Sequence, residues 1–282
     1  MTTKVRITTV CENKSPGGGL LGEHGLSMFL EVGDKRILFD TGSGLTLLHN
    51  AAVLGIDLSR LDAVLLSHGH YDHTGGLQPL CQKVAVDNVY AHPDIFVPKY
   101  RSLNVPFKGN AKYIGPPWLR EDLESLGVQF NLQREAVDLG GGVMLTGEVP
   151  RLKEWTSPEP DLLQKTETGF RDDPFLDDQA LVVDSPAGIV VVLGCAHAGL
   201  VNTLRHVVTL TGKKHFYALL GGTHLFRAPA EQLALIFEEL KNFDLQVVAP
   251  CHCTGFGPTM AFQQAFGDKF VYHAAGSVFE FS

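Results

Sequence analysis

Short apolar runs and longer amphipathic segments alternate along most of the chain. In the first half, apolar and β-branched residues predict strands over residues 5–10, 27–32, 36–39, 63–66 and 84–91. Apolar residues at helical spacing predict a helix over 45–54, and Gly33-Asp34 marks a tight turn between the second and third strands. This order of elements favours an α/β architecture in which helices are layered on sheets.

The second half of the chain repeats this pattern. We predict strands over residues 180–183, 189–193, 217–220 and 246–249. A helix over 200–210 should end at Gly212, and another should begin at Pro229. Four apolar residues of the latter helix share one face, which we expect to pack into the core. They are Leu233, Ile236, Phe237 and Leu240.

The segment between about residues 93 and 177 has poor periodicity. It is rich in proline and contains the run Gly140-Gly141-Gly142. Long irregular inserts in compact domains are usually functional loops or lids. We therefore interpret residues 1–282 as a single domain whose insert at about 93–177 selects the substrate.

The composition fits one domain with a large core. Of the 282 residues, 44% are apolar. Acidic residues outnumber basic ones by 31 to 23, and no basic cluster lies on a predicted surface helix. We therefore expect a small-molecule substrate and no nucleic-acid partner.

The sequence also bears on the compartment. The N-terminus lacks the charged and apolar regions of a signal peptide, and the apolar runs are far shorter than the ~20 residues that span a bilayer. The five cysteines are scattered and odd in number, which argues against a disulfide framework. We expect a cytoplasmic protein with no membrane partner.

The strongest chemical signal directly follows the apolar residues 63–66. Three histidines and one aspartate lie there within six residues: His68, His70, Asp72 and His73. A loop at a strand end can aim these groups at one point, as a four-coordinate metal ion requires. Burying so many polar groups without an ion would be costly. We therefore predict that they bind metal.

Three later histidines have the same placement. His197, His224 and His252 each lie just past the end of a predicted strand, where α/β sheets place their ligands. The repeated placement predicts that they join the metal site. Cys251 and Cys253 flank His252 and are alternative thiolate ligands, but the neighbours of a strand-end ligand often point away from it. Packing is therefore our preferred interpretation of both cysteines.

The pattern His-X-His-X-Asp-His with later strand-end histidines resembles the metallo-β-lactamase superfamily, which includes glyoxalase II and ribonuclease Z. The run Leu38-Phe39-Asp40-Thr41-Gly42 is similar to the turn that precedes the first helix of that family. The resemblance implies a four-layered αββα sandwich with the site at the edge of two packed sheets.

The resemblance also implies a ligand set for each of two ions. The first ion would be held by His68, His70 and His197, and the second by Asp72, His73 and His252. Many relatives bridge the two ions with an Asp in a Gly-Asp-X-Leu/Met-Phe context, where this chain has His224 in the run 222–226. An imidazole nitrogen cannot bridge two ions as a carboxylate does. We therefore expect one or two divalent ions, with His224 ligating only one.

Six further motifs resemble a narrower branch of the superfamily, that of the 7,8-dihydropterin-6-methyl-4-(β-D-ribofuranosyl)aminobenzene-5′-phosphate synthases. They lie at residues 23–27, 90–93, 146–151, 177–181, 194–197 and 221–225. This branch implies a transferase of methanopterin biosynthesis that joins a dihydropterin diphosphate to a ribofuranosyl-aminobenzene phosphate and releases pyrophosphate. Other members of the branch are described only as metal-dependent hydrolases. Hydrolysis of a phosphate or of a carboxylic ester or amide is therefore the alternative.

Both reactions would use the same metal ligands. In a hydrolase, Asp72 or Asp178 would orient or deprotonate the attacking water, so both are candidate catalytic residues.

The candidate substrate-binding residues come from two parts of the chain. Glu148, Arg151 and Arg171 lie in the insert, and the forked donors of Arg suit a phosphorylated substrate. His24 and Ser27 lie beside the first strands and are expected to line the pocket.

Imidazole ligands with a carboxylate suit zinc first, with iron or manganese as alternatives. A di-iron redox centre would need a carboxylate in place of His70 and usually a flavin domain. A non-catalytic metal-binding protein is a third class, but it would be expected to lack ligands in the opening run, and none is missing.

Overall fold

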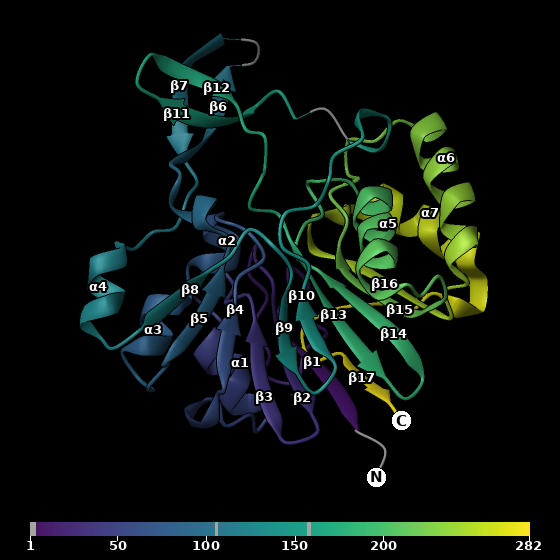
Figure 1. Ribbon diagram of the computed structural model, residues 1–282, viewed down its shortest axis with the longest axis horizontal. Helices are drawn as coiled ribbons and strands as arrows, with labels where there is room; N and C mark the ends of the chain where they lie inside the picture. The colour runs from purple at the N-terminus through teal and green to yellow at the C-terminus, as the bar shows by residue number, and fades with distance from the viewer. Residues whose placement is uncertain (1–3, 105–106, 157–158) are drawn as a thin grey trace.

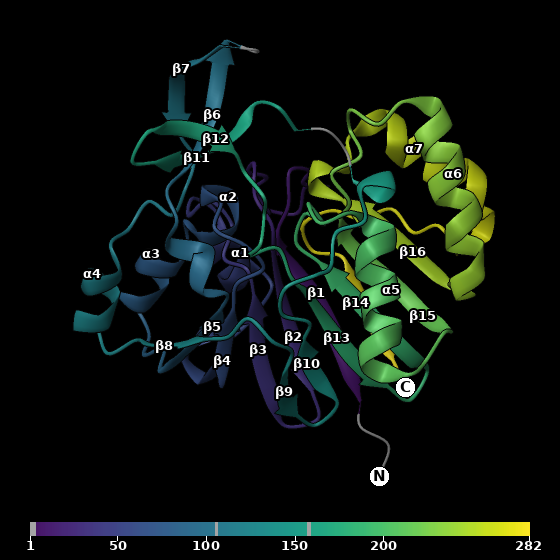
Figure 2. The ribbon, with the colours of Figure 1, turned by 45° about the horizontal axis from the view of Figure 1, so that its top comes forward.

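Two β-sheets packed face to face, with helices on both outer faces, form the body of the protein (Figure 1). The computed structural model describes residues 4–104, 107–156 and 159–282. Figure 2 shows α1, α3 and α4 on one side of the sheets and α5, α6 and α7 on the other. The layers are therefore αββα, as the sequence predicts.

The first sheet has seven strands and the second has six. The first runs β17 (Val278–Phe281), β1 (Val5–Cys11), β2 (Ser27–Val32), β3 (Lys35–Phe39), β4 (Ala63–Leu65), β5 (Asn88–Ala91) and β8 (Gln129–Leu132). The second runs β16 (Val247–Cys251), β15 (Phe216–Gly222), β14 (Gly188–Leu193), β13 (Ala180–Ser185), β10 (Val143–Leu145) and β9 (Val137–Gly140). The helices are α1 (Leu47–Val53), α2 (Tyr71–Thr74), α3 (Leu77–Cys81), α4 (Arg120–Ser125), α5 (Leu200–Thr211), α6 (Ala230–Leu240) and α7 (Phe256–Phe266).

The core consists of three apolar layers. Between the sheets, alternate residues of both sheets interdigitate, with Leu30 of β2 and Leu220 of β15 fully buried. A second layer joins the outer face of the six-stranded sheet to α5, α6 and α7, where Leu204 and Phe262 are fully buried. A third joins the seven-stranded sheet to α1, α3 and α4.

The strand directions bring the candidate ligands to one edge. In the first sheet β3, β4 and β5 are parallel, and in the second β14, β15 and β16 are parallel. Parallel strands end at the same edge of a sheet, so the loops that follow β4, β14, β15 and β16 meet there. These loops, together with the short helix α2 that follows β4, carry all seven predicted ligands.

The structure confirms the predicted elements outside the insert to within a few residues, with one shortening. Residues 84–91 were expected to form one strand, but β5 is limited to Asn88–Ala91, opposite a β4 of only three residues. Helix α5 ends at Gly212, whose φ of 69° is the left-handed conformation that favours glycine. In α6, Ile236 and Leu240 are buried and Leu233 and Phe237 pack beside them.

The segment 93–177 is more ordered than its sequence suggests. Strands β8, β9 and β10 join the main sheets, and Gly140 to Gly142 form the tight β9–β10 turn with positive φ angles. Four other strands form a separate small sheet: β12 (Gly169–Asp172), β11 (Leu162–Thr166), β6 (Lys99–Asn104) and β7 (Phe107–Tyr113). This sheet projects from the sandwich near α2 (Figure 1). The burial of β6 and β11 does not alternate along the strand, which explains why their sequences show no clear period of two.

All five cysteines are free, as expected without a disulfide framework. Among the described residues, no helix combines the length and apolarity that crossing a membrane demands.

A buried histidine near the end of the chain should make stability depend on pH. Nδ1 of His273 is 2.8 Å from the Ala249 carbonyl and Nε2 is 2.6 Å from the Thr9 hydroxyl. Burial lowers the pKa of His273 to about 4. Because this is below the unfolded value of about 6.5, its stabilisation is present above pH 6.5 and lost as the pH falls towards 4.

We expect protonation of His273 to lower the free energy of unfolding by about 2 kcal/mol as the pH falls from 8 to 5. Urea denaturation of the metal-free protein at both pH values would measure the loss. His273→Asn, whose amide can replace Nδ1 but does not titrate, should lose about 2 kcal/mol less over the same interval. Equal losses in the two proteins would contradict the prediction.

Candidate metal centre

The loop after β4 holds the first two candidate ligands in a fixed orientation. The Asp40 carboxylate accepts hydrogen bonds from the backbone N–H and the hydroxyl of Ser67, both at 2.7 Å. The Ser67 oxygen in turn lies 2.9 Å from Nδ1 of His68. This chain of contacts fixes the ring, so that Nε2 of His68 faces Nδ1 of His70 at 3.0 Å.

The third imidazole of this group comes from the loop after β14. Nδ1 of His197 lies 3.1 Å from both carboxylate oxygens of Glu159. Its Nε2 is buried and has no hydrogen-bond partner in the part of the chain that the structure describes. The ring centroid lies 4.9 Å from that of His68 and 5.0 Å from that of His70. We call His68, His70 and His197 the first triad.

Two imidazoles of the first triad favour the neutral form. Burial, together with the neighbouring histidine rings, holds the pKa of His68 and of His70 well below the usual range. Neutral imidazole is the form that binds a metal.

Asp72, His73 and His252 form a second triad beside the first. Nε2 of His73 lies 3.1 Å from Nε2 of His252, and Oδ2 of Asp72 lies 3.3 Å from His252 and 3.9 Å from His73. The Nδ1 atoms point outwards: that of His73 to Asp40 at 2.7 Å and that of His252 to Asn13 at 2.8 Å. Burial opposes a charge on His73, but Asp40 and Asp72 outweigh it and raise its pKa to about 9.

The donor atoms of each triad fit one cation. Two nitrogens bound to one tetrahedral zinc ion at about 2.0–2.1 Å lie roughly 3.3 Å apart. The facing nitrogens are 3.0 Å apart in the first triad and 3.1 Å apart in the second. The unpartnered buried Nε2 of His197 needs such a ligand, since an unsatisfied buried nitrogen is otherwise costly.

Comparison with known proteins agrees with this geometry. Residues 21–252 match the sequence profile of the metallo-β-lactamase superfamily. This chain belongs to the metallo-β-lactamase superfamily. It is similar to a 7,8-dihydropterin-6-methyl-4-(β-D-ribofuranosyl)-aminobenzene-5′-phosphate synthase of Methanocaldococcus jannaschii, with 31% identity over 98% of this chain and 97% of the relative. An uncharacterized protein of the same organism is 30% identical over 91% of this chain and 93% of its own length.

A solved structure gives the same assignment. A metal-dependent hydrolase of the β-lactamase superfamily superposes with a TM-score of 0.82 and 30% identity, and the match covers 99% of each chain. The superfamily fold implies binding of divalent metal, and these relatives support the metal-dependent enzyme that the sequence predicts.

His224 lies beside the triads but is held by a carboxylate. Its Nε2 is 2.7 Å from Glu159, and its Nδ1 has no hydrogen-bond partner among the described residues. Burial opposes a charge on His224, but contacts with Cys253 and Glu159 raise its pKa to about 10. Unlike Nε2 of His73, which faces another candidate ligand, Nε2 of His224 is paired with a carboxylate, so ligation by His224 stays a prediction.

Counted from Gly222, the Asp of the Gly-Asp-X-Leu motif corresponds to Thr223 and not to His224, which corrects the position expected above. Its hydroxyl is hydrogen-bonded to Thr254 at 3.0 Å. No carboxylate therefore stands at this position.

Asp178 supports the loop of His197. Its Oδ2 accepts a hydrogen bond from the backbone N–H of Ala198 at 2.8 Å, while Oδ1 is buried with no partner among the described residues. Burial raises the pKa of Asp178. Among the described residues, Asp178 belongs to none of the groups whose ligand atoms all lie within 4.8 Å of one another. Its catalytic role stays a prediction.

The predicted substrate-binding residues fall into different surroundings. Ser27 is fully buried and donates its hydroxyl to the Asp40 carbonyl at 2.8 Å, so the expectation that it lines the pocket is wrong. On β2 it shares a face with Phe29, which packs towards the helices that cover the seven-stranded sheet, and this explains the burial. His24 is largely exposed, with Nε2 only 3.1 Å from Asp72, at the mouth of the second triad.

The insert residues differ in their distance from the ligands. Arg151 lies over the ring of Phe175, 5.5 Å from its centroid, and that ring stacks on His197 at 4.3 Å. Glu148 contacts Arg134 and His92 at 3.4 and 3.5 Å. Arg171 donates to Gln164 at 2.9 Å on the small sheet. Only Arg151 of the three thus belongs to the wall of the metal centre.

Sequence reasoning missed several residues that orient the ligands. Asp40 and Glu159 hold His73 and His197, while Asp177 accepts a hydrogen bond from the Gly69 N–H at 2.7 Å. Lys99 of the small sheet is buried and donates to Asp177 at 2.9 Å. The sequence could have indicated Asp40 and Asp177, because they lie in the runs 38–42 and 177–181 that resemble motifs of the family. Glu159 lies in an irregular segment with no such signal.

Asp40→Asn should weaken metal binding without removing a ligand. The amide keeps the shape but loses the charge that holds His73 and Ser67. Loss of such a supporting contact typically costs 10–100-fold in metal affinity, which competition with a chelating dye would measure. Asp34→Asn, in the exposed β2–β3 turn, is the control and should bind as the wild type does. An unchanged affinity in Asp40→Asn would show that Asp40 is only structural.

Proposed function

We propose that this chain is a two-metal enzyme that acts on a phosphorylated small molecule. The first triad would hold one divalent ion and the second triad the other. The convergence of both sets of donor atoms at one sheet edge supports this proposal more than any other observation. Zinc is the first choice because imidazoles dominate the donors, with iron or manganese as alternatives.

Bound divalent ions would supply Lewis-acid stabilisation of negative charge on phosphate oxygens. The residues of the chain provide the rest of the site. Asp40, Glu159 and Asn13 hold the rings in place, and the buried loops exclude water. Asp72 would ligate the second ion, and His24 at the mouth would contact the substrate as it enters. Asp72 and Asp178 remain the candidates for moving a proton.

The proposed reaction follows the Methanocaldococcus jannaschii relative. The chain would join a dihydropterin diphosphate to a ribofuranosyl-aminobenzene phosphate and release pyrophosphate, as an enzyme of methanopterin biosynthesis. Identity of 31% over nearly the whole of both chains supports this assignment. The free cysteines suit a reducing compartment, so we place the enzyme in the cytoplasm.

The insert at about 93–177 would select the substrate within this single domain. Its residues Glu159 and Phe175 touch His197, and Arg151 lies on Phe175. Nη1 of Arg151 is buried and has no partner among the described residues. An unpaired guanidinium nitrogen beside a metal centre suits a phosphate oxygen.

Hydrolysis of a phosphate or a carboxylic ester or amide is the second candidate. The similar solved structure, described as a metal-dependent hydrolase, favours it at 30% identity. The same ligands would serve both reactions.

Assay of the zinc-loaded protein separates the two candidates. Pyrophosphate release that requires both the pterin diphosphate and the aminobenzene phosphate would support the synthase. Cleavage of phosphate or carboxylic esters without such release would replace it with the hydrolase. His68→Ala should abolish turnover, while His215→Ala, at an exposed imidazole outside the triads, should not. Fewer than one metal ion per chain with no turnover on either substrate class would overturn the enzyme proposal.

Arg151→Ala tests the proposed phosphate contact. A hydrogen bond to a charged group contributes about 1.5–3 kcal/mol, so KM for the phosphorylated substrate should rise roughly 10- to 100-fold. Steady-state kinetics would measure it, with Arg120→Ala as the control because Arg120 pairs with Glu124 on exposed α4. An unchanged KM would place the phosphate elsewhere, and Arg171→Ala would then be the next variant to assay.

A further inference from the structure

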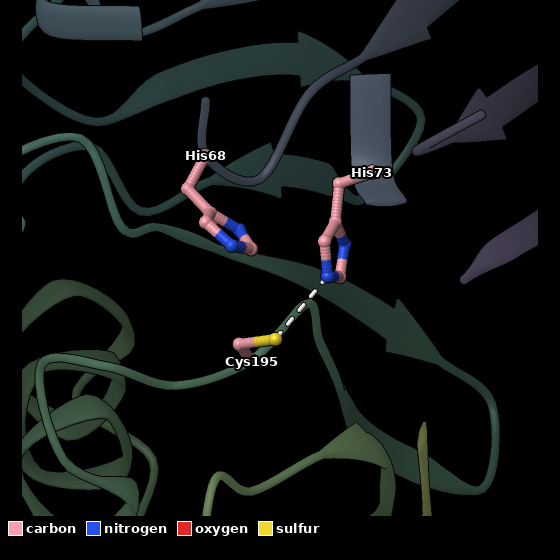
Figure 3. Close-up of side chains that lie close together, drawn as sticks. All are labelled: His68, His73 and Cys195. Atoms are coloured by element: carbon pink, nitrogen blue, oxygen red, sulfur yellow. Dashed lines mark hydrogen bonds between the residues drawn. The ribbon is translucent and has the colours of Figure 1, made fainter. Parts of the chain in front are cut away.

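Cys195 lies between the two triads. It follows β14 in the loop that carries His197 and is only 3% exposed. Its sulfur is 3.2 Å from Nε2 of His73. In Figure 3 the thiol points towards the His73 ring, with His68 on the same side of the loop. Neither Cys195 nor its contact with His73 is predicted by the sequence.

The sulfur is within reach of both triads. It lies within 4.8 Å of donor atoms of His68 and His73 in one group, and of His197 in another. The Cys195 sulfur also lies within 4.8 Å of a donor atom of His252. The thiol therefore neighbours two donors of the first triad and two of the second.

We propose that the Cys195 sulfur bridges the two divalent ions, in place of the carboxylate that many members of the superfamily use. This inference rests on the two-metal centre of the proposed function. A thiolate has several lone pairs on one atom and can bind two cations, whereas an imidazole nitrogen has one. Thr223 and His224, in the region of the usual Asp, point their side chains to Thr254 and Glu159 instead.

The distances agree with shared ligation. Zinc binds imidazole nitrogen at about 2.0–2.1 Å and thiolate sulfur at about 2.3 Å, so a sulfur and a nitrogen on one tetrahedral ion lie roughly 3.5 Å apart. The observed separation from His73 is 3.2 Å. The buried, unpartnered Nε2 of His197 is an independent sign that a cation belongs at this point.

Cys253 is a natural control because it is a second thiol beside the centre. Its sulfur accepts a hydrogen bond from the His224 N–H at 3.3 Å and lies 3.8 Å from the Cys195 carbonyl. It shares a ligand group with Cys195 and His252 but with no member of the first triad. It can therefore reach at most one ion.

Cobalt substitution provides the test. The full-length protein loaded with Co²⁺ should show a sulfur-to-cobalt charge-transfer band in the near ultraviolet that grows through both the first and the second equivalent. Cys195→Ser should lose this band. It should also lower the affinity for one of the two ions by at least the tenfold that loss of an outer-shell contact costs, which metal content after dialysis would measure. Cys253→Ser and Cys81→Ser should keep both the band and two ions per chain.

A band that survives in Cys195→Ser, or one that saturates at the first equivalent, would overturn the bridge. If Cys195→Ser fails to fold, X-ray absorption spectroscopy of the zinc-loaded wild type shows whether sulfur binds the ions. A sulfur shell at about 2.3 Å around both ions supports the proposal, and a shell of nitrogen and oxygen alone contradicts it. A disulfide between Cys195 and Cys253 in that protein would also contradict it. Two bound ions without sulfur leave the proposed function intact, whereas no bound metal overturns both.

Discussion

The convergence of imidazole nitrogens on one buried point is the constraint on which the rest of the site depends. Two facing nitrogens at 3.0 Å, as in His68 and His70, have no stable arrangement in a dry interior unless a proton or a cation lies between them. A shared ring proton would satisfy only this pair, whereas the buried Nε2 atoms of His70 and His197 have no hydrogen-bond partner among the described residues, which favours a cation. The surrounding carboxylates then have a clear purpose. Asp40 and Glu159 bind the outward Nδ1 atoms of His73 and His197 and so turn each Nε2 inwards.

This arrangement strains the backbone. Six described non-glycine residues have positive φ, and five of them carry or contact the candidate ligands: Asp40, Phe175, Ala196, His224 and His252. The loops after the strands must turn sharply to aim their side chains at one edge, and such conformations persist only where the surroundings determine them. Gly194 shows the same crowding, because a Cβ at that position would overlap the Ser67 hydroxyl. The sandwich therefore supplies the rigidity that the strained loops require.

The sequence predicted what depends on local pattern. Strand periodicity located the sheets, and a polar run directly after residues 63–66 located the loop of His68 to His73. The sequence did not predict the residues that reach the site only through long-range contacts of the fold. Glu159 lies in an irregular segment, and only the fold brings it to His197. Cys195 contacts His73 only because the loop after β14 meets the segment after β4. Ser27 was misjudged because nearness in sequence to His24 does not show on which side of β2 a side chain lies.

The ligands alone do not decide between synthase and hydrolase, because both reactions place negative charge on oxygens that a divalent ion can stabilise. In the proposed function the difference comes from the insert, which contacts the candidate ligands. Arg151 lies on Phe175, Phe175 stacks on His197, and Lys99 of the small sheet connects through Asp177 to Gly69. A substrate that moves the small sheet would therefore also act on the loop between His68 and His70. In this chain the residues proposed to select the substrate and those proposed to hold the metal are joined by direct contacts, so substrate specificity and metal geometry are expected to change together.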